Sequence, residues 1–67
     1  MSNLTPQQSE AAVALKKAHE QFVAADEALI ADGELVQTTH VLEYLVTRNL
    51  LREATERAER AFAPLMP

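Results

Sequence analysis

The residues best suited to chemistry in this sequence are a histidine and a glutamate spaced for one face of a helix. His40 and Glu43 are three positions apart, and Tyr44 follows. Helical bundles that bind paired metal ions use the opposite order, Glu-x-x-His, together with further carboxylates from facing helices. Neither histidine has a glutamate three residues before it. We therefore expect no metal site, and we interpret His40 as closing the end of a helical interface over Leu29.

A second polar pair, Arg48 and Asn49, interrupts an apolar stretch between Leu45 and Leu50. A polar residue at a helical interface can fix the register or the oligomeric state. Arginine and asparagine at an interface can also bind a partner's carboxylate, a phosphate or a nucleotide. We favour the structural role, and a bound anion would fit a dimer that brings two copies of Arg48 together.

Groups that could form a catalytic centre are otherwise missing from the sequence. It has no Gly-rich phosphate loop, no paired carboxylates at apolar positions and no serine placed with a histidine and an aspartate. His19 is interpreted as a partly exposed residue on a helix surface. An enzyme needs a nucleophile or an acid–base pair held in a cleft. The sequence therefore predicts a protein that is not an enzyme and that uses no cofactor.

Length and composition predict a single small domain that gains stability by self-association. The 67 residues carry a net charge of −4 and include no cysteine. So short a chain is marginally stable without disulfides, a metal or a partner chain. The charge makes nucleic acid an unlikely ligand, and no apolar run is long enough to span a membrane. The absence of cysteine fits a reducing, cytoplasmic setting.

The elements that must position these residues are two long helices joined by a short turn. Thr5, Pro6 and Gln8 form a capping-box start for the first helix, and Gly33 suits the left-handed conformation past its end. The second helix starts at a cap formed either by Asp32 or by a threonine after the turn, and it stops before a proline. The predicted helix, turn, second helix and short apolar tail occupy residues 6–31, 32–37, 38–63 and 64–67.

Large and small residues alternate at heptad spacing in both helices. In the first helix the large residues are Leu15, Phe22 and Leu29, and the small ones are Ala11, Ala18 and Ala25. In the second, Tyr44, Leu51 and Leu65 alternate with Thr47, Ala54 and Ala61. A short turn makes the helices antiparallel neighbours. If facing residue numbers sum to 69, large meets small at four central levels: Leu15 with Ala54, Ala18 with Leu51, Phe22 with Thr47, and Ala25 with Tyr44.

The contact between the two helices does not bury all of the apolar residues near the turn. A helix that is apolar nearly all round is typical of a buried helix, and an exposed apolar surface marks an interaction site. We expect this surface to pair two hairpins into a four-helix bundle, or else to bind a different protein. The predicted dimer or partner interface consists of Val23, Ile30, Val41, Leu42, Leu45, Val46, Arg48, Asn49 and Leu50.

The sequence therefore predicts an all-α protein, an antiparallel two-helix hairpin that dimerises. The function that fits best is a small interaction protein, an adaptor or inhibitor of a larger protein, of the size of phage- or plasmid-encoded accessory proteins. One alternative is a dimer that binds a small ligand or nucleotide at Arg48 and Asn49. A second alternative is an RNA-binding hairpin dimer, which needs Lys16, Lys17 and the arginines on one face.

Overall fold

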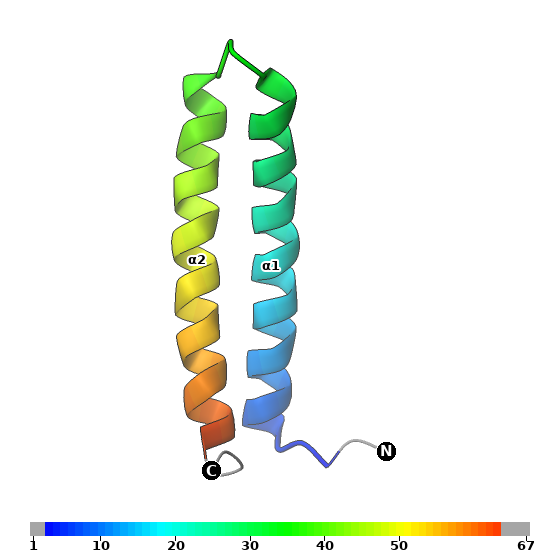
Figure 1. The fold of residues 1–67 in the computed structure, drawn as a ribbon. Helices are drawn as coiled ribbons and strands as arrows, with labels where there is room; N and C mark the ends of the chain where they lie inside the picture. Colours follow the sequence, from blue (N-terminus) through cyan, green and yellow to red (C-terminus); the bar gives the residue numbers. More distant parts are fainter. Residues whose placement is uncertain (1–2, 64–67) are drawn as a thin grey trace.

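The computed structural model describes residues 3–63 and consists of two long helices packed side by side in opposite directions (Figure 1). Helix α1 spans Pro6–Asp32 and helix α2 spans Thr38–Phe62. No strand occurs in this part of the chain. The predicted all-α antiparallel hairpin is therefore confirmed, and the helix ends fall within one residue of the predicted ones. The apolar tail predicted for residues 64–67 lies outside the described residues.

The start of α1 is fixed by the predicted capping box. The Thr5 side chain accepts a hydrogen bond from the backbone N–H of Gln8, and the Gln8 side chain accepts one from the backbone N–H of Thr5, both at 3.1 Å. Pro6 occupies the first turn, where no backbone donor is needed. Two of the donors that a helix start leaves unpaired are thereby satisfied.

The turn between the helices is built around Gly33, whose backbone angles are φ 61° and ψ −125°. The φ is positive, as expected, but the ψ is wrong for the left-handed helical conformation that the sequence suggested. These angles belong to the first central position of a type II′ turn. The backbone N–H of Leu35 donates to the carbonyl of Asp32 at 3.2 Å, which is the hydrogen bond that closes such a turn. Gly33 is therefore required by a tight turn, and its backbone N–H also caps α1 by donating to the carbonyl of Ile30 at 3.1 Å.

The start of α2 is organised by an acidic side chain from the other helix. Gln37 is the residue that precedes the helix, and its own side chain makes no capping hydrogen bond. Its backbone N–H instead donates to the carboxylate of Asp32 at 3.0 Å. Of the two starts that the sequence left open, α2 begins after the turn, but its entry is held by Asp32 and not by a threonine.

The seam between the helices follows the predicted register. The Gln8 side-chain amide donates to the backbone carbonyl of Ala61 at 3.1 Å, and these two residue numbers sum to 69. One detail differs, because the rings of Phe22 and Tyr44 contact each other with centroids 5.1 Å apart. Two large side chains thus meet diagonally. Four small seam residues are buried, namely Ala11, Ala18, Ala25 and Ala58, whereas Thr47, Ala54 and Ala61 are half-buried.

The large seam residues are only half-buried. Among the described residues, no large side chain is fully enclosed. Leu15, Phe22, Tyr44 and Leu51 each keep part of their surface in contact with solvent. Two helices can cover each other along one line only, so each large residue in the seam shows one flank to the outside. The hairpin therefore has a closely packed seam but no closed hydrophobic core.

Candidate functional site

The apolar residues predicted to form an interface are on the surface of the hairpin. Ile30 is 70% exposed and Val46 is 58% exposed, and Leu42, Leu45, Leu50 and Val23 are also exposed. Val41 is half-buried. Scattered surface leucines are common, whereas neighbouring exposed aliphatic side chains along one helix indicate an interaction site. The structure places these side chains where a partner could reach them.

The predicted interface residues lie on two sides of the molecule rather than on one. A helix turns by about 100° per residue, and α2 meets α1 through Tyr44, Leu51 and Ala58. This repeat places Leu42 and Val46 on the side of α2 that faces away from α1. We call Leu42, Val46 and Leu50, which follow one another at four-residue spacing, the outer stripe.

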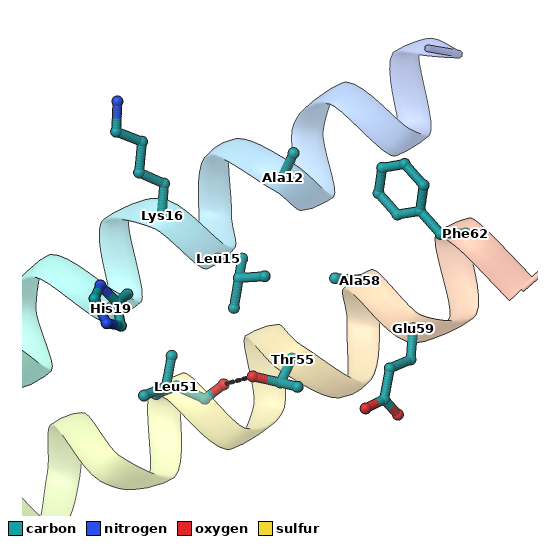
Figure 2. A pocket seen from close by; sticks show the side chains of 9 residues that line it. All are labelled: Ala12, Leu15, Lys16, His19, Leu51, Thr55, Ala58, Glu59 and Phe62. Carbon is teal, nitrogen blue, oxygen red and sulfur yellow. Dashed lines mark hydrogen bonds between the residues drawn. The ribbon is translucent and has the colours of Figure 1, made fainter. Parts of the chain in front are cut away.

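Between the helices, on one flank of the hairpin, lies a groove of about 750 Å³ (Figure 2). Leu15 and Leu51 form its floor, and the ring of Phe62 closes the end that is far from the turn. Lys16 and Glu59 extend outward on its two rims. The complete lining is Ala12, Leu15, Lys16, His19, Leu51, Thr55, Ala58, Glu59 and Phe62.

The polar atoms of the groove leave its floor apolar. Thr55 donates its hydroxyl hydrogen to the carbonyl of Leu51 at 2.8 Å, so this hydroxyl is satisfied within α2 (Figure 2). No buried side-chain nitrogen or oxygen in the described part of the chain lacks a hydrogen-bond partner. A surface with this character suits apolar side chains better than a polar small molecule.

Sequence reasoning missed this groove. It placed Leu15 in the seam and His19 on a partly exposed helix surface, and the structure agrees with both, but it did not predict that the two would line one groove. The missed signal is a second row of residues at seven-residue spacing on each helix, which we call a heptad line. On α1 it contains Ala12 and His19, and on α2 it contains Thr55 and Phe62. Small and apolar residues beside a seam indicate that another surface can pack there.

Arg48 and Asn49 lie together in a shallow depression of about 230 Å³ that α2 forms by itself, with Leu45 and Arg52. The Asn49 side-chain oxygen accepts a hydrogen bond from Arg52 at 2.6 Å, and its nitrogen donates to Glu53 at 3.3 Å. Asn49 is thus occupied by neighbours on its own helix. The depression is smaller than typical ligand pockets, so a nucleotide would need a second protein copy to enclose it. That alternative stays a prediction.

The RNA-binding alternative also stays a prediction. It needs the basic side chains on one face, whereas Arg57 approaches Glu10 of α1 at 3.7 Å. Lys16 lies on the groove rim opposite an acidic side chain, that of Glu59. Interleaved acids weaken the attraction of a basic patch for phosphates.

His40 and Asp32 form a polar clamp at the turn. The His40 ring nitrogen Nδ1 lies 2.7 Å from the Asp32 carboxylate, which also accepts the backbone N–H of Gln37. The Gln37 hydrogen bond, followed by the contact with His40, lowers the pKa of the Asp32 carboxyl below its ordinary value. Within residues 3–63, no three histidine, aspartate or glutamate side chains gather as metal ligands would. The clamp therefore joins the two helices.

Comparison with known proteins gives no relative for this hairpin. No family model, curated protein or solved structure matches the chain. Neither helix in the described part of the chain is long and apolar enough to cross a membrane. A functional conclusion therefore rests on the surfaces of the hairpin itself.

Proposed function

We propose that the protein is a small, non-enzymatic interaction module of the cytoplasm that acts as a homodimer. Two hairpins pack into a four-helix bundle, and the bundle binds a larger protein as an adaptor or an inhibitor. One observation carries this proposal. The hairpin exposes large aliphatic side chains along α2, and its seam encloses no large side chain in the described residues.

The energetics of burial support this proposal. Fully burying one aliphatic side chain contributes about 1.5–3 kcal/mol, while association costs about 4–15 kcal/mol in lost freedom and ordering. Burying a few aliphatic side chains from each copy can therefore offset the cost of dimerisation. Ile30, Leu45 and Val46 are each at least half exposed in the single hairpin, so each has most of its burial still to gain.

The predicted interface can serve both partners. Val23, Ile30 and Val41 lie toward the groove by their helical spacing, and the outer stripe lies elsewhere on α2. Since the two surfaces are separate, a dimer that uses one can leave the other to a larger protein. A homodimer and a hetero-complex are then parts of the same function.

The proposal is tested first by the mass of the purified protein in solution. Light scattering and sedimentation over a concentration series should give twice the 7.4 kDa mass of one chain. A monomer that persists at several hundred micromolar would overturn the proposed homodimer. The second test is cross-linking to a larger protein in host lysate, compared between the natural chain and a dimeric Val46→Asp variant. A captured protein that is lost with the variant supports a role for the outer stripe, and identical capture refutes it.

A further inference from the structure

Four heptad lines extend the groove along the whole flank of the hairpin. Two rows of residues at seven-residue spacing start in the groove on α1, at Ala12 and at Lys16. Two such rows on α2 finish in the groove, at Phe62 and at Glu59. Residues seven positions apart differ by only about 20° around a helix, so each line remains on the flank of the groove. We call these lines together the groove face. Its members are Ala12, His19 and Asp26; Lys16, Val23 and Ile30; Val41, Arg48, Thr55 and Phe62; and Leu45, Arg52 and Glu59.

We propose that a second copy of the chain packs on this surface, groove face to groove face, about a two-fold axis that runs parallel to the helices. The inference rests on the homodimer proposed above and specifies its interface and orientation. In this arrangement α1 of one copy lies against α2 of its partner, and the two turns are at the same end of the bundle. Every pair of neighbouring helices in the bundle is then antiparallel.

The charges on the two rims of the groove face support this orientation. Lys16 and Asp26 lie along α1, while Glu59 and Arg48 lie along α2. In the register in which facing residue numbers sum to 69, Lys16 is about six residues from the level of Glu59 and Asp26 about five residues from that of Arg48, or about 8–9 Å along the helices. None of the four belongs to the salt bridges of the described residues, which join Asp32 to His40 and Glu10 to Arg57. A two-fold axis along the helices exchanges the rims and brings each charge to the opposite charge of the partner.

The directions of the side chains strengthen this match. A side chain leans toward the start of its own helix. In the antiparallel register, Lys16 therefore leans toward the level of Glu59, and Glu59 leans back toward Lys16. Asp26 and Arg48 converge in the same way. Arg52 is at the level of Lys16 but reaches away from it, because its guanidinium donates to Asn49, which is nearer the turn.

The other symmetric arrangement would pair Lys16 with the partner's Asp26 but would also set like charges together on α2. A two-fold axis across the helices would put the turns at opposite ends and place α2 against α2 of the partner. With the hairpins fully overlapped, Arg48 of one copy would then meet the level of Arg52 in the other, on both sides of the axis. Like charges facing each other across an interface oppose association. The parallel axis instead places Arg48 and Arg52 against α1 of the partner, which carries the acidic Asp26 as well as Lys16.

The size and shape of the groove face suit a dimer interface. The hairpin measures 46 Å by 21 Å by 18 Å, so one long face covers on the order of 900 Å², close to the ~800 Å² that each partner contributes to a typical stable interface. Ala12 and Ala58 leave room beside Leu15 and Leu51, and such alternation lets facing layers interlock. Leu42 and Val46 stay outside this interface on both copies.

Mixing two charge-reversed chains tests the interface. Lys16→Glu and Glu59→Lys should each weaken homodimerisation by about tenfold or more, because each homodimer then carries two like-charged pairs. Mixing the two variants should restore tight dimerisation, since both pairs in the heterodimer become opposite in charge. Lys17→Glu and Glu53→Lys, which change the same charges away from the groove face, are the matched controls. No recovery on mixing would overturn the proposed pairing, and recovery supports it.

The orientation is tested by distance. The protein has no cysteine, so a single Glu34→Cys substitution in the exposed turn accepts one spin label per chain. The parallel axis places the two labels at one end of the bundle, about 20–25 Å apart, which is the width of two adjacent helices. An axis across the helices would separate them by nearly the 46 Å length of the hairpin. The longer distance overturns the proposed orientation.

Substitutions at two valines distinguish a dimer that uses a different interface from a protein that forms no dimer. Val23→Glu introduces a charge on the groove face, and Val46→Glu introduces one on the outer stripe. We expect the first variant to be monomeric by light scattering and the second to remain dimeric, with Ile30→Glu as an independent test of the groove face. The reverse pattern would overturn the groove-face dimer while preserving a homodimer. A natural chain that never dimerises would overturn both.

Discussion

Replacing Gly33 with L-alanine should destabilise the hairpin through the backbone alone. A Cβ built at Gly33 would meet no atom within 4 Å, so the substitution creates no steric clash with the rest of the protein. The cost comes from φ 61° and ψ −125°, a combination that an L-residue avoids. Holding a residue in such a region costs about 1–3 kcal/mol. For a domain of this size each kcal/mol lowers the Tm by about 4–8 °C.

A D-alanine at the same position is the matched control. The chain is short enough for chemical synthesis, and D-alanine carries the same methyl group with mirrored backbone preferences. The Gly33 angles are comfortable for a D-residue, and replacing glycine by a residue that fits reduces the freedom of the unfolded chain, which adds about 0.4–1 kcal/mol of stability. The two alanine isomers should therefore shift the Tm in opposite directions.

The assay is thermal and urea unfolding of the three chains at one protein concentration, because the proposed dimerisation would make the Tm depend on concentration. We expect L-alanine to unfold first, the natural chain next and D-alanine last. Equal stability of the two alanine isomers would refute the argument from backbone strain. A large loss with both isomers would mean that the added methyl group clashes, contrary to the open space at this position.

Three further predictions concern the seam, the helix start and the turn. Ala18→Leu should cost about 1–3 kcal/mol in urea unfolding by overpacking the seam, and a fully tolerated leucine would contradict the close approach of the helices. Gln8→Glu keeps the capping acceptor but cannot donate to Ala61, so it should cost about 1 kcal/mol in the same assay, and no loss would mean that this hydrogen bond is not stabilising. The lowered pKa of Asp32 means that folding favours its ionised form, so its stabilisation should be present above its ordinary pKa of 3.8 and be lost as the pH falls through the lower, folded value. The free energy of unfolding should therefore fall less steeply with decreasing pH for Asp32→Asn than for the natural chain. Parallel curves for the two proteins would contradict this.

The sequence was sufficient to predict the helices and their register, because local chemistry determines both. Thr5 and Gln8 satisfy the first backbone donors of α1 wherever that segment is helical. The antiparallel register follows from alternating large and small residues, which pack well in few alignments. The hydrogen bond from Gln8 to Ala61 reports that register directly.

The hydrogen bonds of the turn and the shape of the groove depend on the three-dimensional arrangement of the helices, which the spacing of residues in the sequence does not specify. A positive φ at Gly33 was expected, but ψ depends on how two helices must meet. The Asp32 carboxylate reaches the backbone of Gln37 only because the turn brings them together. The groove arises because the side chain of Leu15 enters the seam and also shows one flank outside it. A helical-wheel projection assigns each residue a single direction, so it does not show that Leu15 both enters the seam and lines the groove.

The half-buried seam implies that the folded fraction of the protein would depend on its concentration in the cell. Because no large side chain in the described residues is fully enclosed, the proposed dimer interface would supply part of the folding free energy. Folding would then be linked to association, and the folded fraction would rise with concentration. Expression level would act as a threshold: chains made in small amounts open often and are open to proteases, while chains made in larger amounts protect one another. The amount of the protein in the cell would then influence how much of it is folded and able to bind.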